Sequence, residues 1–454
     1  MGVMSFDNIS RGGPMGRETM KLFHRLGQGL PNTLLVTAGI AVAGLFSGMV
    51  LARTLLPVSR GEFSVVLIWP GALAMFGELG LGFSFSFYAG KDRAKLNGLW
   101  TLALGVSLIW GGFLSIVGAL VFPGIVHLSA VAHSCLIWNL ITVPISLLTG
   151  YSALFLLGSN RVFEFNMVRL SGAVVYTVGI LAVALTHQAS LTKYTLVYIL
   201  SQWLACAVAV GFVVRRLKPV LRWQSSLVKP VFIYGGKTYL SSLAAQMNLR
   251  LDQLLMSSLV AMEQLGLYVI AVSFSSMLMP LYNALAVVTL PRVTCAPDLR
   301  AGGRQVVRYL QLGLVMGLPA MAFAIITAPW LLPLFFSAKY ASSILLAQIL
   351  LVGVIFQGSN IVLGNGLRGL GKPGKTTLSE GAGLIVTVAL LVWLLPVYGA
   401  LGAAVASLSA YSLVTFIQLF FVRRAAGLEW RDFRLASWKY LFPDWDALRQ
   451  WRVK

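Results

Sequence analysis

The sequence predicts an all-α, polytopic membrane protein, with about twelve transmembrane helices in two parallel six-helix lobes around a central cavity. Of the 454 residues, 58% are hydrophobic and only 11% are charged, whereas soluble globular chains carry about 25% charged residues. The apolar residues gather in runs close to the ~20 residues that a membrane-spanning helix needs. Basic residues collect between alternate runs, and short motifs recur in the two halves of the chain.

The apolar runs divide the chain into five parts. A cytoplasmic N-terminal segment, 1–32, precedes the first lobe, 33–214, and a basic cytoplasmic linker, 215–230, leads to the second lobe, 231–424. Residues 425–454 form a basic, tryptophan-rich tail, and such a composition suits the cytoplasmic face and the membrane interface. The expected spans are 33–56, 62–90, 97–122, 134–158, 165–186, 194–214, 231–258, 264–290, 306–327, 342–367, 376–397 and 400–422.

The distribution of Lys and Arg sets the orientation, because cytoplasmic loops carry the excess of positive charge. With the N-terminus inside and twelve crossings, three of the 35 basic residues, Arg169, Lys237 and Arg250, fall within spans. Those that fall outside are Arg53, Arg60, Lys193 and Lys339. All others lie inside, which predicts an even number of spans and cytoplasmic termini in an inner (cytoplasmic) cell membrane.

Short motifs recur at similar positions in the two predicted lobes. VVRR at 213–216 ends the sixth span and FVRR at 421–424 ends the twelfth. GEF at 61–63 opens the second span and GLY at 266–268 opens the eighth. Parallel repeats are a transporter architecture with the substrate site between the halves. The alternative is a chance recurrence among apolar helices rich in glycine.

The seventh expected span carries polar residues on two sides. At 100° per residue, Asn248 and Asp252 fall on one stripe, whereas Gln246, Arg250 and Gln253 fall on another. A charge at mid-membrane costs ~2.5–3.5 kcal/mol on insertion scales, so we expect this helix between helix groups, with a cavity on at least one side. Arg250 and Asp252 point to nearly opposite sides and form no pair unless the helix is broken there.

The basic residues within spans predict an anionic substrate. Arg250, Lys237 and Arg169 offer positive charge, and the planar guanidinium suits phosphate because it bonds two oxygens at once. The alternative is that Arg250 and Asp252 only bond neighbouring helices. Glu78 is the other acid inside a span. It could couple transport to protons, but a bond to a neighbouring helix is the favoured interpretation.

Other functional classes find little support. The net charge of +21 is spread between apolar runs and forms no basic domain, which argues against nucleic acid. The cysteines form no CxxC pair and no histidine spacing indicates a metal site, so no metal or cofactor is expected. GNGLRG at 364–369 fits a dinucleotide pattern but follows no strand. With no HExxH, GxSxG or Walker motif either, we do not expect an enzyme.

Three stretches carry a resemblance to a known family. LARTLLPVSRGEFSVVLIWPGALAMFGELGLGFSFSFYAG at 51–90 resembles the first two spans of polysaccharide flippases of the multidrug/oligosaccharidyl-lipid/polysaccharide exporter superfamily, with an LART turn and an LGL segment. LRLDQLLMSSLVAMEQLGLYVIA at 249–271 is similar to the seventh-to-eighth span motif, and LPVYGALGAAVASL at 395–408 to the turn between the last two spans. The likeness covers about 33–424.

The resemblance implies a cavity that opens alternately to each side and moves a polyprenyl-pyrophosphate-linked oligosaccharide to the outer leaflet for surface polysaccharide assembly. Membrane lipid is the second expected partner, and a polysaccharide polymerase with chain-length machinery is a further candidate. The positions that could hold the pyrophosphate are Arg53, Arg169, Lys237 and Arg250. The polar or coupling candidates of the cavity are Asp252, Asn248, Gln246 and Glu78.

Two alternative functions remain from different classes. An ion-coupled multidrug antiporter of the same superfamily would want buried acids, yet bases are at least as prominent in these spans. A membrane glycan polymerase would want a large outside loop with catalytic residues, which the sequence lacks.

Lipid II flippases of the same superfamily usually have fourteen spans with arginines in the first two. This chain has twelve expected spans and no arginine deep in the first.

Overall fold

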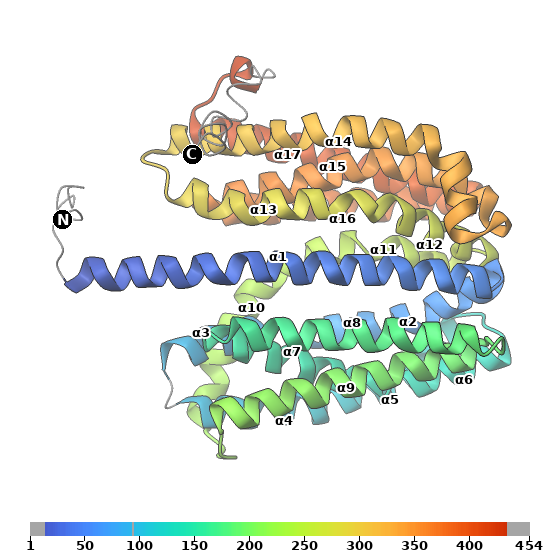
Figure 1. Cartoon of the computed structure of the whole chain (residues 1–454), viewed down its shortest axis with the longest axis horizontal. Helices are drawn as coiled ribbons and strands as arrows, with labels where there is room; N and C mark the ends of the chain where they lie inside the picture. Colours follow the sequence, from blue (N-terminus) through green and yellow to red (C-terminus); the bar gives the residue numbers. More distant parts are fainter. Residues whose placement is uncertain (1–13, 93–94, 434–454) are drawn as a thin grey trace, which may run out of the picture.

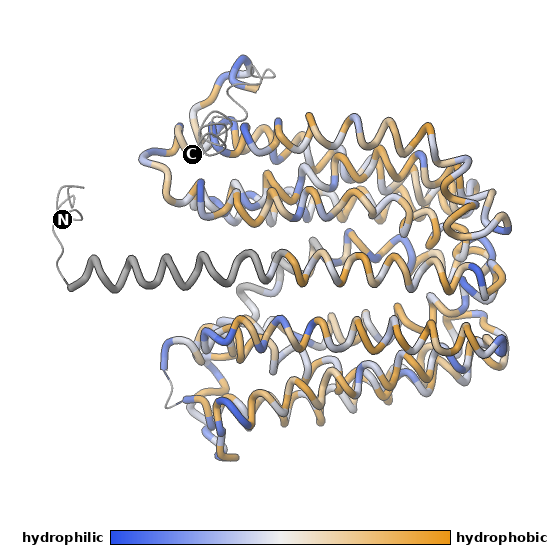
Figure 2. Tube along the Cα trace, viewed as in Figure 1, coloured by the Kyte–Doolittle hydropathy of each residue, from blue (hydrophilic) through white to orange (hydrophobic). Residues whose placement is uncertain are grey.

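The computed structural model describes residues 14–92 and 95–433, without the side chains of residues 14–32, 34, 237, 238, 240–242 and 245. All regular elements of this part are helices, most of them apolar along their length (Figures 1 and 2). Ten of its helices are long and apolar enough to cross a membrane, and one bent pair makes an eleventh candidate. The prediction of an all-helical, multi-pass membrane fold is confirmed. The number twelve and the division into two lobes remain predictions.

The first nine α-helices form what we call the N-terminal half. Helix α1 begins well before the first expected span, and the second expected span is broken into two helices, α2 and α3. The elements are α1 (Pro14–Thr54), α2 (Pro57–Gly77), α3 (Leu81–Lys91), α4 (Leu96–Gly105), the π-helix η3 (Val106–Trp110), α5 (Gly111–Ile125), α6 (Ala130–Asn139), α7 (Thr142–Gly158), α8 (Val162–Leu185) and α9 (Leu191–Leu217).

The remaining helices form the C-terminal half. The expected span 231–258 corresponds to α10 and α11, which a short break separates. The elements are α10 (Ser225–Asn248), α11 (Leu251–Leu259), α12 (Met262–Ser275), η4 (Ser276–Leu278), α13 (Met279–Thr294), α14 (Leu299–Phe336), η5 (Ala338–Ser343), α15 (Ile344–Gly369), α16 (Pro373–Tyr398), α17 (Ala400–Ala426) and η6 (Trp430–Phe433).

The helices of the two halves pack in the same order. In the N-terminal half α8 packs against α1 and α9, while α7 packs against α3 and α9. In the C-terminal half α16 packs against α10 and α17, while α15 packs against α13 and α17. In Figure 1, α13 to α17 group along one side and α4 to α9 along the other, with α1 between them. This is the contact order that a parallel repeat requires.

Two pairs of glycines bring the halves into backbone contact. A Cβ on Gly61 of α2 would lie 1.9 Å from the Met262 carbonyl oxygen, and one on Gly266 of α12 would lie 2.0 Å from the Pro57 carbonyl oxygen. Further along the same span, a Cβ on Gly80 would lie 2.3 Å from the carbonyl oxygen of Gly235 in α10. Side chains would prevent these approaches, so glycine at these positions allows the halves to meet at two levels.

The second span is bent by 50° between α2 and α3. Leu79 and Gly80 there have φ of +51° and +67°, which ends the regular helix. Apolar surroundings offer no water to freed carbonyls, so they need partners from the protein. Tyr239 of α10 donates to the carbonyl oxygens of Met75 and Phe76, at 3.1 and 3.0 Å. The break is therefore stabilised from the opposite half.

Candidate functional site

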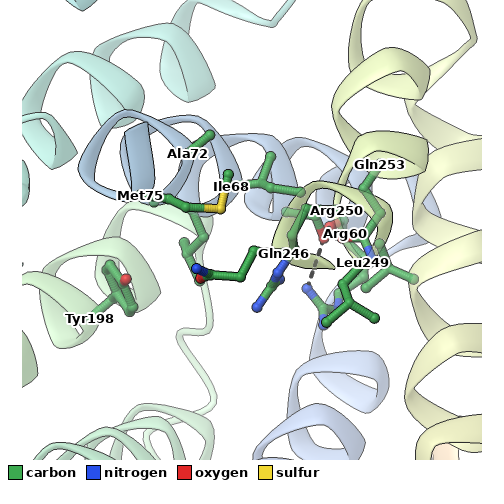
Figure 3. Close-up of a pocket in the computed structure, with 13 residues that line it drawn as sticks. Arg60, Ile68, Ala72, Met75, Tyr198, Gln246, Leu249, Arg250 and Gln253 are labelled. Atoms are coloured by element: carbon green, nitrogen blue, oxygen red, sulfur yellow. Dashed lines mark hydrogen bonds between the residues drawn. The ribbon is translucent and has the colours of Figure 1, made fainter. Parts of the chain in front are cut away.

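A cavity of about 540 Å³ lies between the halves, along α2 and between the two glycine contacts. Helices α2 and α9 line it from the N-terminal half, and the α10–α11 break and α12 line it from the C-terminal half. Figure 3 shows this arrangement. The lining residues are Arg60, Ser64, Leu67, Ile68, Gly71, Ala72, Met75, Tyr198, Gln246, Leu249, Arg250, Gln253 and Val269.

Arg60 is the cationic residue that the N-terminal half contributes to the cavity. Pro57 occupies the first turn of α2, where its fixed φ suits a helix start, and this places Arg60 one turn into the helix. The Arg60 residue is only 7% exposed. Its Nη1 donates to Ser64 Oγ at 3.1 Å, and its guanidinium lies 5.9 Å from the centre of the Phe63 ring. The Nε of Arg60 is buried and has no hydrogen-bond partner in the described part of the chain.

Arg250 is the cationic residue that the C-terminal half contributes. It lies at the break between α10 and α11, where its φ of −130° leaves the helical range. Its side chain is exposed to the cavity rather than packed among apolar neighbours. Figure 3 shows the Arg60 and Arg250 side chains in the same region of the cavity. Two guanidinium groups from different halves thus line one cavity.

The residues on either side of Arg250 are bound inside the C-terminal half. Asp252 is 4% exposed and accepts a hydrogen bond of 2.5 Å from the hydroxyl of Tyr268 in α12. Asn248 is 5% exposed, and its Nδ2 donates to the Glu380 carboxylate at 3.1 Å. These bonds hold the ends of both helices at the break, so Arg250 is presented to the cavity from a fixed support.

The two polar stripes of the expected span 231–258, which forms α10 and α11, have different surroundings. Gln246, Arg250 and Gln253 all line the cavity, whereas Asn248 and Asp252 bond to α16 and α12. This agrees with the prediction of a helix that is polar on two sides with a cavity on one of them. Although the helix is broken, no ion pair among the described residues joins Arg250 to Asp252.

The other predicted cationic residues lie elsewhere. Arg53, at the end of α1, donates to the Leu334 and Phe335 carbonyl oxygens at the end of α14. Arg169 of α8 donates to Thr37 of α1 at 3.3 Å and so connects two helices of the N-terminal half. Neither is among the residues that line the cavity. The side chain of Lys237 lies outside the described residues.

Glu78 occupies the break between α2 and α3 and does not line the cavity. Its carboxylate lies over Gly82, where a Cβ would be 2.8 Å from Oε1. Tyr151 of α7 donates to its backbone carbonyl oxygen at 3.0 Å. The structure thus places Glu78 at a helix junction, apart from the two arginines.

The cavity is also lined by Arg60, Ser64 and Tyr198, which the sequence does not predict as site residues. The sequence predicts Arg60 in an outside loop, because the second apolar run begins after it; the structure corrects this, since Arg60 is buried within α2. Pro57 could have indicated this, because proline is common at the first position of a helix and so predicts a helix that begins before Arg60. No local sequence pattern indicates that Tyr198 of α9 lines the cavity. Within the described residues no group of three or more His, Cys, Asp or Glu could hold a metal ion.

Comparison with known proteins identifies the family. The sequence pattern of the family described as "Polysaccharide biosynthesis protein" matches residues 50–345, well over half of the chain. The chain belongs to this polysaccharide biosynthesis protein family. A Shigella flexneri protein named "Putative O-antigen transporter" is 22% identical over 369 residues, which cover 78% of this chain and 87% of that protein.

Solved structures show the fold of this polysaccharide biosynthesis family member. The lipid II flippase MurJ in an inward closed conformation has a TM-score of 0.76 at 15% identity, with 88% of each chain covered. An inward-facing multidrug resistance MATE transporter of the MOP superfamily has a TM-score of 0.71 at 15% identity, covering 87% of this chain and 98% of that one. The chain therefore has a MurJ/MATE-like fold.

Proposed function

We propose that this protein is a flippase that moves a polyprenyl-pyrophosphate-linked oligosaccharide from the inner to the outer leaflet of the cytoplasmic membrane by alternating access. The observation that carries the proposal is the pair of arginines, Arg60 and Arg250, that line one cavity from opposite halves. The family and the O-antigen transporter relative support a role in surface polysaccharide assembly. We place both termini in the cytoplasm, from the distribution of basic residues.

The chemistry of the cavity suits a pyrophosphate head group. Charge-assisted hydrogen bonds from guanidinium groups to phosphate are short and strong, and each guanidinium can bond two oxygens. Arg60 has a buried Nε without a partner among the described residues, so an anion would satisfy it. The side chains of Ser64, Gln246 and Gln253 line the same cavity and can bond sugar hydroxyls.

The cavity has room for the head group of the proposed substrate but not for its polyprenyl tail. At about 540 Å³ the cavity falls within the range of small-molecule sites, roughly 300–1,000 Å³. It is far too small to hold both the head group and the polyprenyl chain. The tail would remain in the bilayer while the charged head crosses between the halves. This division keeps the apolar tail in lipid and gives the anion polar partners throughout the crossing.

A multidrug antiporter of the same fold is less well supported. Cationic drugs need acidic partners, because a charge inside a membrane protein needs a counter-charge. The described residues that line the cavity include two arginines and no aspartate or glutamate. An enzymatic role as a glycan polymerase has no support in the transporter relatives. A polymerase and chain-length machinery stay predicted partners.

The decisive test deletes the gene in its native host and measures lipid-linked oligosaccharides by mass spectrometry. Protection from an added external glycosidase reports which leaflet holds them. We expect a completed single unit to accumulate on the inner leaflet, in a strain where redundant flippases are also deleted. Units that reach the outer leaflet but stay unpolymerised would instead indicate a polymerase. No change in any glycan lipid, together with lost dye efflux, would indicate the antiporter.

A further inference from the structure

The end of the molecule that holds the α1–α2 junction carries a group of contacts between the halves. Arg53, in the last turn of α1, donates from Nη2 to the Leu334 carbonyl oxygen at 2.6 Å and from Nε to the Phe335 carbonyl oxygen at 3.3 Å. Leu334 and Phe335 end α14, which belongs to the C-terminal half. Arg53 therefore joins the halves through two hydrogen bonds to helix-end carbonyls.

These carbonyls suit a removable cation. The last carbonyls of a helix lack partners within the helix and carry the negative end of its dipole, so a guanidinium stabilises them. Arg53 is itself exposed, which means that water can replace it when the halves separate. When these bonds break, water can satisfy both the guanidinium and the freed carbonyl oxygens.

Two further contacts close the same end. The hydroxyl of Tyr340, a fully buried residue of η5, donates to the Leu55 carbonyl oxygen at 3.2 Å, just after α1. The backbones of α2 and α12 touch at Gly61 and Gly266. Arg60, which lines the cavity, directly precedes Gly61. The contacts therefore lie next to the cavity, at the end that the basic residues assign to the outside.

We infer that Arg53 is a latch on the exit side of the cavity, which holds α1 against the end of α14 until the halves separate to release substrate outward. In the state that is closed to the outside, Arg53 then stabilises the contact between the halves and does not bind the pyrophosphate. The buried Tyr340 and the glycine contact complete the closed gate, and the Arg53 bonds lie at its exposed edge. The inference rests on the alternating access of the proposed function, but access can be measured without any transport.

The test measures access to the cavity from outside. Ala72 lines the cavity and is 7% exposed, so Ala72→Cys reports when the cavity opens, after Cys135, Cys206 and Cys295 are replaced by Ala. Intact cells are treated with a membrane-impermeant maleimide and the rate of labelling is followed. Loss of a charge-assisted hydrogen bond shifts a two-state equilibrium by roughly tenfold, so Arg53→Ala should raise the labelling rate by about that factor.

Matched variants separate the latch from a general effect of charge. Lys193 is a cation on the same predicted side, but its Nζ bonds Gln188 within the N-terminal half, at 2.8 Å. Lys193→Ala should leave the labelling rate unchanged. Tyr340→Phe removes only the bond to the Leu55 carbonyl and should raise labelling, which keeps the gate testable if Arg53→Ala fails to fold.

Three outcomes would overturn the inference. One is an unchanged labelling rate in a folded Arg53→Ala protein, and another is an equal rise in Lys193→Ala. The third is a rise seen only in inverted vesicles, which would place Arg53 on the entry side. The labelling assay needs no glycan lipid, so a failure of the latch and a failure of the flippase proposal are distinguishable.

Discussion

Arg250 lies in the break between α10 and α11 and lines the cavity, whereas Asp252, two residues later in α11, is bonded to Tyr268. The arginine is exposed and the aspartate is 4% exposed. The two side chains therefore depend on different surroundings, and their substitutions should fail in different ways. A loss of binding is expected at Arg250 and a loss of stability at Asp252.

Replacing Arg250 with alanine should abolish glycan export while leaving the folded protein intact. The side chain is exposed and packs against little, so the free energy of unfolding should change by no more than ~0.5 kcal/mol. Export is measured as outer-leaflet oligosaccharide, and folding as thermal stability in detergent. Normal export by a stably expressed Arg250→Ala protein would remove Arg250 from the site.

Replacing Arg60 with lysine should reduce export strongly although the charge is kept. Lysine cannot make the planar, two-bond contact with phosphate that arginine makes. Arg60→Ala should reduce export further, because one guanidinium of the pair is then missing. Arg161→Lys, a change of an exposed residue at the start of α8, is the matched control and should export normally. Equal export by Arg60→Lys and the unchanged protein would show that a point charge is sufficient there.

Replacing Tyr268 with phenylalanine should destabilise the protein by ~1–3 kcal/mol, the typical cost of leaving a buried polar atom without its hydrogen-bond partner. The change leaves the buried carboxyl of Asp252 without its donor from α12. Thermal unfolding in detergent measures the effect. Tyr398→Phe provides the control, because that residue is 58% exposed. Indistinguishable stabilities of the two variants would show that Asp252 does not depend on Tyr268.

Alanine substitutions at two glycines with the same backbone conformation distinguish the cost of overpacking from the cost of backbone strain. Gly80 and Gly371 have φ of +67° and +73°, but only at Gly80 would a Cβ meet another backbone, 2.3 Å from the Gly235 carbonyl oxygen. Gly371→Ala should cost only the ~1–2 kcal/mol of a left-handed alanine, and Gly80→Ala should cost ~1–3 kcal/mol more through overpacking. Equal thermal stabilities would mean that α3 and α10 separate easily.

Much of the fold could be predicted from local sequence. Apolar runs predicted most of the candidate spans, because lipid exposure demands apolar residues over a fixed length, but α10 and α11, which correspond to the expected span 231–258, are not among the candidates in the described residues. Helical periodicity separated the stripe of Arg250 from the stripe of Asp252. The break between α2 and α3 was not predicted, since it depends on hydroxyl donors from Tyr151 and Tyr239 that lie far away in the sequence.

The candidate site was only partly predictable for the same reason. Arg250 and Gln246 were identified because their own helix shows which side they share. Arg53 and Arg169 have partners on α14 and α1 that no local pattern indicates. Arg60 was missed because a helix can begin in a polar stretch when a proline occupies its first turn. Burial of a charge depends on tertiary packing, which hydropathy does not measure.

The contact between α2 and α12 is self-complementary. Gly61 touches the backbone at Met262, and Gly266 touches the backbone at Pro57, the reciprocal pattern of an isologous dimer interface. The motifs that recur between the halves align Arg60 with Leu265, a buried apolar residue. A pseudo-symmetric frame therefore carries an unsymmetrical set of charges. Under the proposed function, the anion would therefore meet an arginine from each half at positions that the pseudo-symmetry does not relate.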